Sequence, residues 1–426
     1  MLCAAGVFFR CTISTFFYGK TMISVSPTTS RVFGAALLSA ALVLPSVQFA
    51  YADAAPERGV VSLKYLNYQD SQSADTPATA SLLSRDRIAV NALSIMSVMP
   101  VAGEWSVGVS FMEDSVTGAS PAYHSSGFPA SKSDVKSGAS GELRHAVDLQ
   151  LTRYFSQGSV TAGTSYSKES DYISRSCSLQ GSLSTEDKNT TFTLGGSFND
   201  DSIDLNKPNV VLSKQQLAEE KKQVFAGLVG VTRVLTKKDI VQLNLGYSNG
   251  NGYYTDPYKD PDNRPRDRNS FTALGRWNHH FDGTDGTARL SYRYYSDTFG
   301  IRAHTLDAEY VQPLNHGWTL TPLLRLYTQS ESDFYFTVAE EQFNGDGTPK
   351  APITTTPYYT EDQRLSAFGA VTLGLKVSKQ LNPDWLVDLK FEQYQQRDEW
   401  SLSGSGDPGL ATFNARSIQV GISRKI

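Results

Sequence analysis

The chain has little cysteine, and it has no long apolar run outside its N-terminal region. Of the three cysteines in 426 residues, only Cys177 lies beyond residue 52. A single cysteine excludes an internal disulfide and the metal sites that are built on cysteine pairs. No apolar stretch beyond residue 52 approaches the roughly 18 residues of a transmembrane helix. If this chain crosses a membrane, it therefore does so with strands.

Basic charge is also scarce. Three of the 39 basic side chains precede residue 53, which leaves 36 basic and 43 acidic residues and a net charge of -7 in the remainder. A nucleic-acid-binding protein would need a clustered basic face. We therefore expect no nucleic-acid partner. Aromatic residues are plentiful instead, with 21 tyrosines and 21 phenylalanines.

The N-terminal region has the pattern of an export signal. Arg31 precedes an apolar stretch at 32–44, and Ala50 and Ala52 then form the small-x-small pattern of a cleavage site. We predict that residues 1–52 are a signal peptide, cleaved between Ala52 and Asp53. Export through the inner membrane of a Gram-negative bacterium follows from this reading.

The segment before this signal is unusually long. Met22 is a plausible true start, in which case residues 1–21 are a mis-annotated extension. We predict that residues 53–426 form a single domain.

The mature chain alternates between apolar and polar residues. Val241, Leu243 and Leu245, for example, alternate with Gln242 and Asn244. Such a period of two is typical of a strand with one apolar and one polar face. A soluble β-sandwich alternates too, but its water-facing side usually carries many charges, whereas here Gly, Ser, Thr, Asn and Gln dominate. In strand after strand, the first or last residue of the apolar face is aromatic. Aromatic residues at these positions form the girdles of a lipid-facing barrel, so the pattern favours a membrane barrel over a soluble sandwich.

Connection lengths support the same class. Short turns alternate with long polar stretches, as in outer-membrane barrels with short periplasmic turns and longer extracellular loops. The sequence predicts an all-β, transmembrane, antiparallel up-and-down β-barrel of about sixteen strands. The predicted strands are 59–68, 86–99, 105–115, 143–155, 159–170, 173–184, 189–199, 222–235, 239–249, 268–281, 286–297, 302–313, 318–329, 362–378, 384–396 and 411–425.

Several stretches carry a resemblance to a known family. They are EDSVTGASP at 113–121, SKESDY at 167–172, GYYTDPYK at 252–259, YRYYSD at 292–297 and DFY at 333–335. Together they resemble the uncharacterised bacterial family catalogued as domain of unknown function 3570, over nearly the whole mature chain. The resemblance implies a secreted, Gram-negative, barrel-like protein without an established activity, so it assigns no functional residues.

Catalytic patterns are weak. Gly246-Tyr-Ser-Asn-Gly250 has the G-x-S-x-G spacing of a nucleophile elbow, but that motif needs a strand-to-helix turn and a partner histidine. Here it lies at the end of a predicted barrel strand. We therefore predict no catalytic residues, no enzyme activity and no cofactor.

Metal-binding patterns are weak as well. His279 and His280 are adjacent and point to opposite faces of a strand, so they cannot chelate one ion together. The Asp-rich loop at 256–267 could supply oxygen ligands to calcium, or its arginines could contact lipopolysaccharide phosphate. It lacks the regular ligand spacing of a calcium loop. We therefore predict no metal site and read it as a solvated loop, with both alternatives open.

Inward-facing charges are the remaining candidates for function. The alternation predicts that ten charged side chains face the lumen: Asp148, Arg289, Arg293, Asp307, Glu309, Arg325, Lys376, Asp388, Lys390 and Glu392. They could line a pore and select solutes by charge, or they could be paired charges that fill the interior.

Three function classes follow. We favour a porin-like channel for small solutes, because sixteen strands leave room for an aqueous lumen. The alternative is a closed structural, assembly or surface-interaction barrel, and a barrel enzyme is the least favoured. The expected partners are outer-membrane lipid and lipopolysaccharide, the outer-membrane assembly machinery and small solutes.

Overall fold

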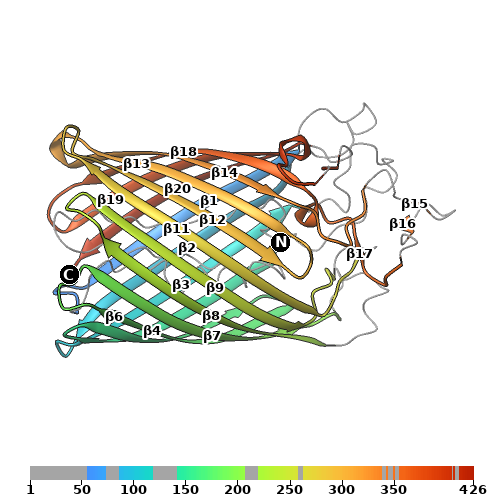
Figure 1. Cartoon of the computed structure of the whole chain (residues 1–426), viewed down its shortest axis with the longest axis horizontal. Helices are drawn as coiled ribbons and strands as arrows, with labels where there is room; N and C mark the ends of the chain where they lie inside the picture. Colours follow the sequence, from blue (N-terminus) through green and yellow to red (C-terminus); the bar gives the residue numbers. More distant parts are fainter. Residues whose placement is uncertain are drawn as a thin grey trace.

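The computed structural model describes residues 55–72, 86–118, 142–206, 219–257, 262–337, 342–343, 349–350, 355–404, 406–407 and 412–426. Sixteen antiparallel strands form a closed barrel, in which each strand pairs with its neighbours in sequence and β20 closes against β1. The strands are strongly tilted, and long loops gather at one end of the barrel (Figure 1). The predicted fold class is confirmed.

The barrel strands have these bounds: β1 (Val60–Gln72), β2 (Asp86–Val101), β3 (Trp105–Gly118), β4 (Glu142–Phe155), β5 (Gly158–Lys168), β6 (Tyr172–Ser184), β7 (Thr190–Ile203), β8 (Glu220–Val234), β9 (Asp239–Gly252), β11 (Asp267–Phe281), β12 (Gly286–Asp297), β13 (Arg302–Pro313), β14 (Trp318–Gln329), β18 (Phe368–Gln380), β19 (Trp385–Arg397) and β20 (Phe413–Lys425). Short elements lie in the connections: β10 (Asp262–Asn263), β15 (Gln342–Phe343), β16 (Pro349–Lys350), β17 (Tyr359–Thr360), and the 3-10 helices η4 (Asn315–Gly317), η6 (Gln363–Leu365) and η7 (Asp398–Trp400). No helix in the described part of the chain is long and apolar enough to cross a membrane.

The alternation in sequence becomes an alternation in exposure. On β9, Leu243 and Leu245 are 47% and 42% exposed, whereas Asn244 between them is 4% exposed. The apolar residues thus face outward and the polar residue faces the interior, which inverts the arrangement of a soluble protein. This inversion is what a barrel surrounded by lipid requires.

Tight turns join the strands at the periplasmic end. Four turn residues other than glycine adopt a positive φ, namely Ala102, Lys188, Asp285 and His316, with φ between 51° and 61°. Each lies in a connection that the sequence predicts to be short. The left-handed conformation costs roughly 1–2 kcal/mol per residue. The hydrogen bonds between the two strands that each turn joins compensate this cost.

Several strand ends differ from the prediction at the extracellular side. The strands β1, β3, β7 and β9 end at residues 72, 118, 203 and 252, each beyond its predicted end. The stretch Asn199–Ser202 is too polar to show the apolar alternation, yet Asp200 pairs in register with Gln223 of β8. Hydrogen-bonded ladders therefore continue above the apolar band, where no lipid imposes an apolar face.

The predicted strand at 362–378 also begins too early. Residues 363–365 form η6, because the Asp362 carboxylate accepts a hydrogen bond from the Arg364 backbone N–H at 3.1 Å and caps the turn. The strand β18 begins at Phe368. The sequence placed the start of the strand at Asp362 because this residue alone does not indicate a turn, and its tertiary partners cannot be seen in the sequence.

Candidate functional site: the barrel interior and its extracellular mouth

The structure places all ten predicted lumen residues on the interior face of their strands. Lys376, Lys390 and Glu392 are buried, whereas their outward neighbours Leu375 and Phe391 are more than 40% exposed. The same alternation holds at the other positions: Asp148 on β4, Arg289 and Arg293 on β12, Asp307 and Glu309 on β13, Arg325 on β14, and Asp388 on β19.

The strands β12, β13 and β14 carry cross-strand ion pairs. Arg325 lies directly opposite Asp307, and its Nε is 2.5 Å from the Asp307 Oδ1. Arg289 lies opposite Glu309, with 3.8 Å between Nη1 and Oε2. Arg293, further up β12, donates a hydrogen bond to the Thr305 hydroxyl at 3.1 Å. The sequence shows these residues singly, and the register brings them together.

A second group of charges lies on β18, β19 and β1. Lys390 and Glu392 are two residues apart on one face of β19, with 2.9 Å between Nζ and Oε1. Lys64 of β1 approaches Asp388 to 4.0 Å. Lys64 was not predicted as a lumen residue, although its place between Ser62 and Leu66 in the alternation of β1 could have indicated it.

Another interior ion pair was missed as well. Arg144 of β4 donates from Nε to the Asp114 Oδ2 of β3 at 2.7 Å, and both side chains are buried. The predicted residue Asp148 lies on the same face four residues further along β4, where the Ser110 hydroxyl donates to it at 2.6 Å. Because Arg144 and Asp148 are four residues apart on one strand, the alternation alone could have identified Arg144.

The opposite part of the wall, from β4 to β11, carries small hydroxyl groups beside two buried ion pairs, Lys222 with Asp201 and Arg268 with Asp297. Interior serines and threonines meet across neighbouring strands at hydrogen-bond distance. The pairs are Thr152–Thr161 (2.9 Å), Ser159–Ser182 (2.8 Å), Ser165–Ser176 (2.5 Å), Ser184–Thr191 (2.9 Å) and Ser248–Ser270 (2.8 Å). Paired charges thus occur around the interior wall, and small hydroxyl pairs are added to them between β4 and β11.

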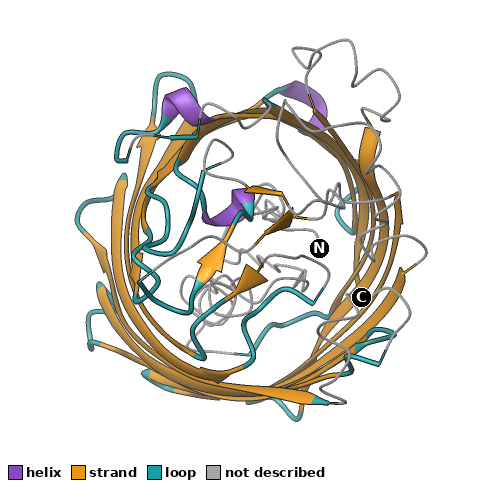
Figure 2. Ribbon diagram, turned by 90° about the vertical axis from the view of Figure 1, so that its right-hand side faces the viewer, coloured by secondary structure: helices purple, strands orange, loops and turns teal. Residues whose placement is uncertain are grey.

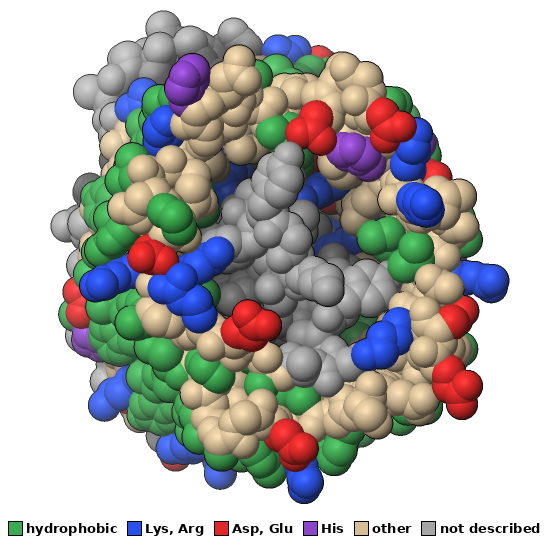
Figure 3. Space-filling view, turned by 90° about the vertical axis from the view of Figure 1, so that its left-hand side faces the viewer, with side chains coloured by type: hydrophobic (Ala, Val, Ile, Leu, Met, Phe, Trp, Pro, Cys, Tyr) green, Lys and Arg blue, Asp and Glu red, His purple; other side chains and the backbone are tan. Residues whose placement is uncertain are grey.

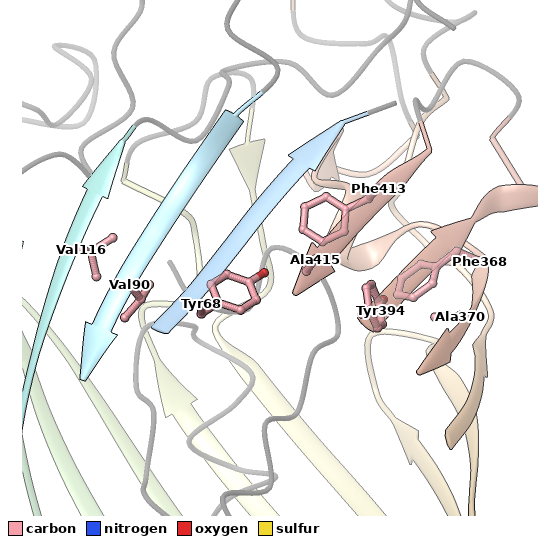
Figure 4. Packing of buried hydrophobic residues seen from close by; sticks show 8 residues of the cluster. All are labelled: Tyr68, Val90, Val116, Phe368, Ala370, Tyr394, Phe413 and Ala415. Carbon is pink, nitrogen blue, oxygen red and sulfur yellow. The ribbon is translucent and has the colours of Figure 1, made fainter. Parts of the chain in front are cut away.

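An apolar cluster lies higher on the interior wall, toward the extracellular end (Figure 4). It joins β1–β3 to β18–β20, and its members are Tyr68, Val90, Val116, Phe368, Ala370, Tyr394, Phe413 and Ala415. The Tyr68 and Tyr394 hydroxyls donate to Asp70 and Gln396, at 3.0 and 2.9 Å. These bonds satisfy the polar ends of rings that are otherwise surrounded by apolar groups.

At the extracellular mouth, the β9–β11 and β14–β18 connections are joined by a buried ionic latch. We use this name for Asp256, Asp262, Arg264, Asp362 and Arg364. Arg264 donates to Asp262 at 3.0 Å and to Asp362 at 2.8 Å, and Arg364 donates to Asp362 and Asp256. The strands β10 and β17 pair beside it. In the view into this end, short strands and loops lie within the outline of the barrel (Figure 2).

In the latch, burial and the neighbouring carboxylates have opposite effects on the pKa of Arg264. Burial alone would lower the pKa of Arg264, but attraction by Asp262 and Asp362 outweighs burial and raises that pKa. Burial raises the pKa of the neighbouring Tyr253, and Asp256 and Asp262 raise it further. The arginines of the latch therefore stay charged and the tyrosine stays neutral under all physiological conditions.

The Asp-rich loop is only partly described, because Asp260 lies outside the described residues. Asp262 and Asp256 accept hydrogen bonds from Arg264 and Arg364 of the latch, and Asp267 accepts one from Asn251 at 2.6 Å. Among the described residues, no group of His, Cys, Asp and Glu side chains has an arrangement that could hold a metal ion. Of the described carboxylates of this loop, Asp256 and Asp262 thus serve the latch, and Asp267 is bonded to Asn251.

The two remaining motifs have structural partners. Ser248, in the G-x-S-x-G stretch, lies within β9, and its hydroxyl is 2.8 Å from that of Ser270. His279 Nδ1 is 2.7 Å from the Asp239 carboxylate, whereas His280 contacts Thr287 at 3.3 Å. The two histidines thus have different partners, as the alternation predicts.

The closed sixteen-strand barrel, with its outward apolar face and polar interior, defines a transmembrane β-barrel protein of the outer-membrane type. The chain belongs to the family described as "Protein of unknown function (DUF3570)", whose model matches residues 34–417. This confirms the resemblance seen in the sequence.

Solved structures of low identity are similar to this chain. A BenF-like porin from Pseudomonas fluorescens Pf-5 has 9% identity and a TM-score of 0.44, over 87% of this chain and 98% of the porin. OccK9 (OpdG) from Pseudomonas aeruginosa has 10% identity and a TM-score of 0.42, over 87% and 98%. The siderophore receptor PirA from Acinetobacter baumannii has 9% identity and a TM-score of 0.43, over 81% of this chain and 53% of the receptor, so this chain spans about half of that protein. A comparison with curated proteins finds no significant match.

Proposed function

We propose that this barrel is a porin-like outer-membrane channel for small solutes. The observation that carries the proposal is the polar interior wall, with ion pairs on β12–β14 and β18–β1 and hydroxyl pairs on β4–β11. Barrels of eight strands are filled by their side chains, whereas barrels of sixteen to eighteen strands can enclose an aqueous channel. The ten predicted residues are the proposed pore-lining set.

The pairing of the interior charges bears on selectivity. Paired charges of opposite sign produce only a weak net field along the lumen, although they polarise it locally. Small polar solutes without a large net charge are therefore the proposed cargo, and we propose no enzyme activity.

The second candidate is a closed structural, assembly or surface-interaction barrel. The buried latch favours it, because the latch holds two connections together that are 98 residues apart in sequence. Within the channel proposal, the latch restricts the extracellular mouth. Within the closed-barrel alternative, it stabilises a permanent cover.

Liposome swelling separates these two candidates. The refolded protein is placed in vesicles, and uncharged sugars of increasing mass are added outside. The channel proposal predicts swelling that falls with solute size, and faster swelling in an Arg264→Gln variant with an opened latch. If neither protein supports swelling, the closed-barrel alternative is correct.

Export and membrane insertion belong to the same proposal. Residues 1–52 lie outside the described residues, and their role as a signal peptide remains a prediction. N-terminal sequencing of membrane-extracted protein should begin at Asp53, and a retained N-terminus before Ala50 would contradict it. We propose that the outer-membrane assembly machinery inserts the barrel next to lipopolysaccharide and phospholipid.

A further inference from the structure

Three of the five tryptophans begin a barrel strand. Trp105, Trp318 and Trp385 are the first residues of β3, β14 and β19. All three strands start after short turns, so the three indoles lie at the periplasmic end of the barrel. Trp318 is 45% exposed, and the next outward residues on each strand are apolar. Figure 3 shows this end, where Lys and Arg side chains lie beside the apolar outer surface.

Each of these tryptophans has a basic residue directly opposite on the neighbouring strand. The register pairs are Trp105 with Arg153, Trp318 with Lys379, and Trp385 with Arg424. The distances from the cationic centre to the indole ring centroid are 5.3, 5.0 and 5.2 Å. Three separate strand pairs thus repeat one arrangement, in which a cation lies beside the ring of a strand-initial tryptophan.

The three cations have little neutralisation within the protein. Arg153 approaches Glu104 only to 4.0 Å, and both side chains are largely exposed. Lys379 donates to the backbone carbonyl of His316, which carries no formal charge. No carboxylate in the described part of the chain lies within ion-pair distance of Arg424. The cations therefore keep charge and hydrogen-bond donors for an anion outside the protein.

We propose that these three Trp–cation pairs bind the phosphate groups of phospholipids in the periplasmic leaflet of the outer membrane. The cation would donate to the phosphate oxygens, and the indole would lie at the interfacial level where tryptophans concentrate. The acyl chains would then follow the outward apolar residues of the same strand, such as Val107 on β3. Each pair thus contacts a lipid at both its polar and its apolar part.

The repetition of the arrangement favours lipid over a protein partner. The pair on β3–β4 is separated from the pair on β19–β20 by β1 and β2. A docked protein would need one contiguous patch, whereas each small pair matches the size of one lipid headgroup. All three pairs are also continuous with the apolar surface that lipid already covers.

Tryptophan fluorescence tests this proposal without any assumption about transport. The refolded protein is placed in phosphatidylcholine vesicles that contain either brominated phosphatidylglycerol or brominated phosphatidylcholine, and quenching is measured against lipid fraction. A cation near a membrane surface contributes roughly 1 kcal/mol, so we expect about fivefold stronger quenching affinity for the anionic lipid. The triple variant Arg153→Gln, Lys379→Gln, Arg424→Gln should show equal affinity for both lipids.

Arg233 offers a matched control. It is an exposed outward cation near the periplasmic end of β8, but its register partners are Thr190 and Val241 rather than an aromatic residue. Arg233→Gln should leave the lipid preference unchanged. If Arg233→Gln lowers the preference as much as the triple variant, general surface charge explains the effect and the proposal is wrong.

Two further outcomes would also overturn the proposal. One is a wild-type protein that shows no preference for the anionic lipid. The other is a triple variant that keeps the preference but assembles poorly in cells, which would indicate a protein partner at this rim. Folding is checked by heat-modifiable migration on gels, and if the triple variant does not fold, each single variant should lose about a third of the excess quenching.

Discussion

A charge on the outer surface of β7 tests the orientation of the strands. Leu194 is 67% exposed on the outward face, and its register neighbours are Gly181 and Val229. Thr193 faces the interior between Ser182 and Gly230, which are small enough to leave room for a longer side chain. Leu194→Arg and Thr193→Arg therefore place the same charge at the same depth on opposite faces of the wall.

The expected cost follows from the position of Leu194 along the strand. It lies four residues after the start of β7, at Thr190. At a rise of about 3.3 Å per residue and a tilt of about 40°, it lies about 10 Å above the periplasmic edge, close to the middle of an apolar band of about 25 Å. Arginine at this depth costs roughly 2–4 kcal/mol on the lipid face. Thr193→Arg should cost less than about 1 kcal/mol, because polar interior groups can solvate the guanidinium.

The assay is urea-dependent folding into lipid vesicles, followed by heat-modifiable migration on gels. Leu194→Arg should lower the urea midpoint and the assembly yield, and Thr193→Arg should stay close to wild type. Equal losses in both variants, or a larger loss for Thr193→Arg, would refute the assigned register, because a slip of one residue exchanges the two faces.

Three further predictions concern the mouth and the lumen. Arg264→Gln removes the cation that lies between two buried carboxylates, Asp262 and Asp362, at a cost of roughly 3–5 kcal/mol to the latch, so proteases should cut the extracellular connections faster while the barrel stays folded. Arg325→Gln removes the partner that lies 2.5 Å from Asp307, so ion selectivity should shift toward cations, and adding Asp307→Asn should reverse the shift. Gly300 has a φ of +90°, and a Cβ there would collide with the Asp333 carboxylate. Gly300→Ala should therefore destabilise this connection by roughly 1–3 kcal/mol, seen as faster local hydrogen exchange.

The barrel could be predicted from the sequence because lipid imposes a simple rule on each strand. Leu243 and Leu245 had to be apolar and Asn244 could be polar, so the alternation indicated both the strand and its faces. The rule applies only to the part of each strand that lipid surrounds. For that reason the polar extension of β7 to Ile203 and the cap formed by Asp362 before β18 were not predicted.

The candidate site could be predicted only in part. The interior position of Asp307 and Arg325 follows from the alternation, but their pairing depends on the register between β13 and β14. The latch was not predictable at all, because it joins Arg264 to Asp362 across 98 residues of sequence. An alternation describes one strand at a time, whereas ion pairs and latches depend on which strands and loops become neighbours.

Single-channel recording in a planar lipid bilayer tests the channel proposal most directly. The refolded wild-type protein should produce discrete conductance steps, and the Arg264→Gln variant should produce steps of equal or larger size. Wild-type and variant protein that insert correctly but show no conductance would contradict the proposal, and would leave a closed barrel whose interior charges serve packing alone.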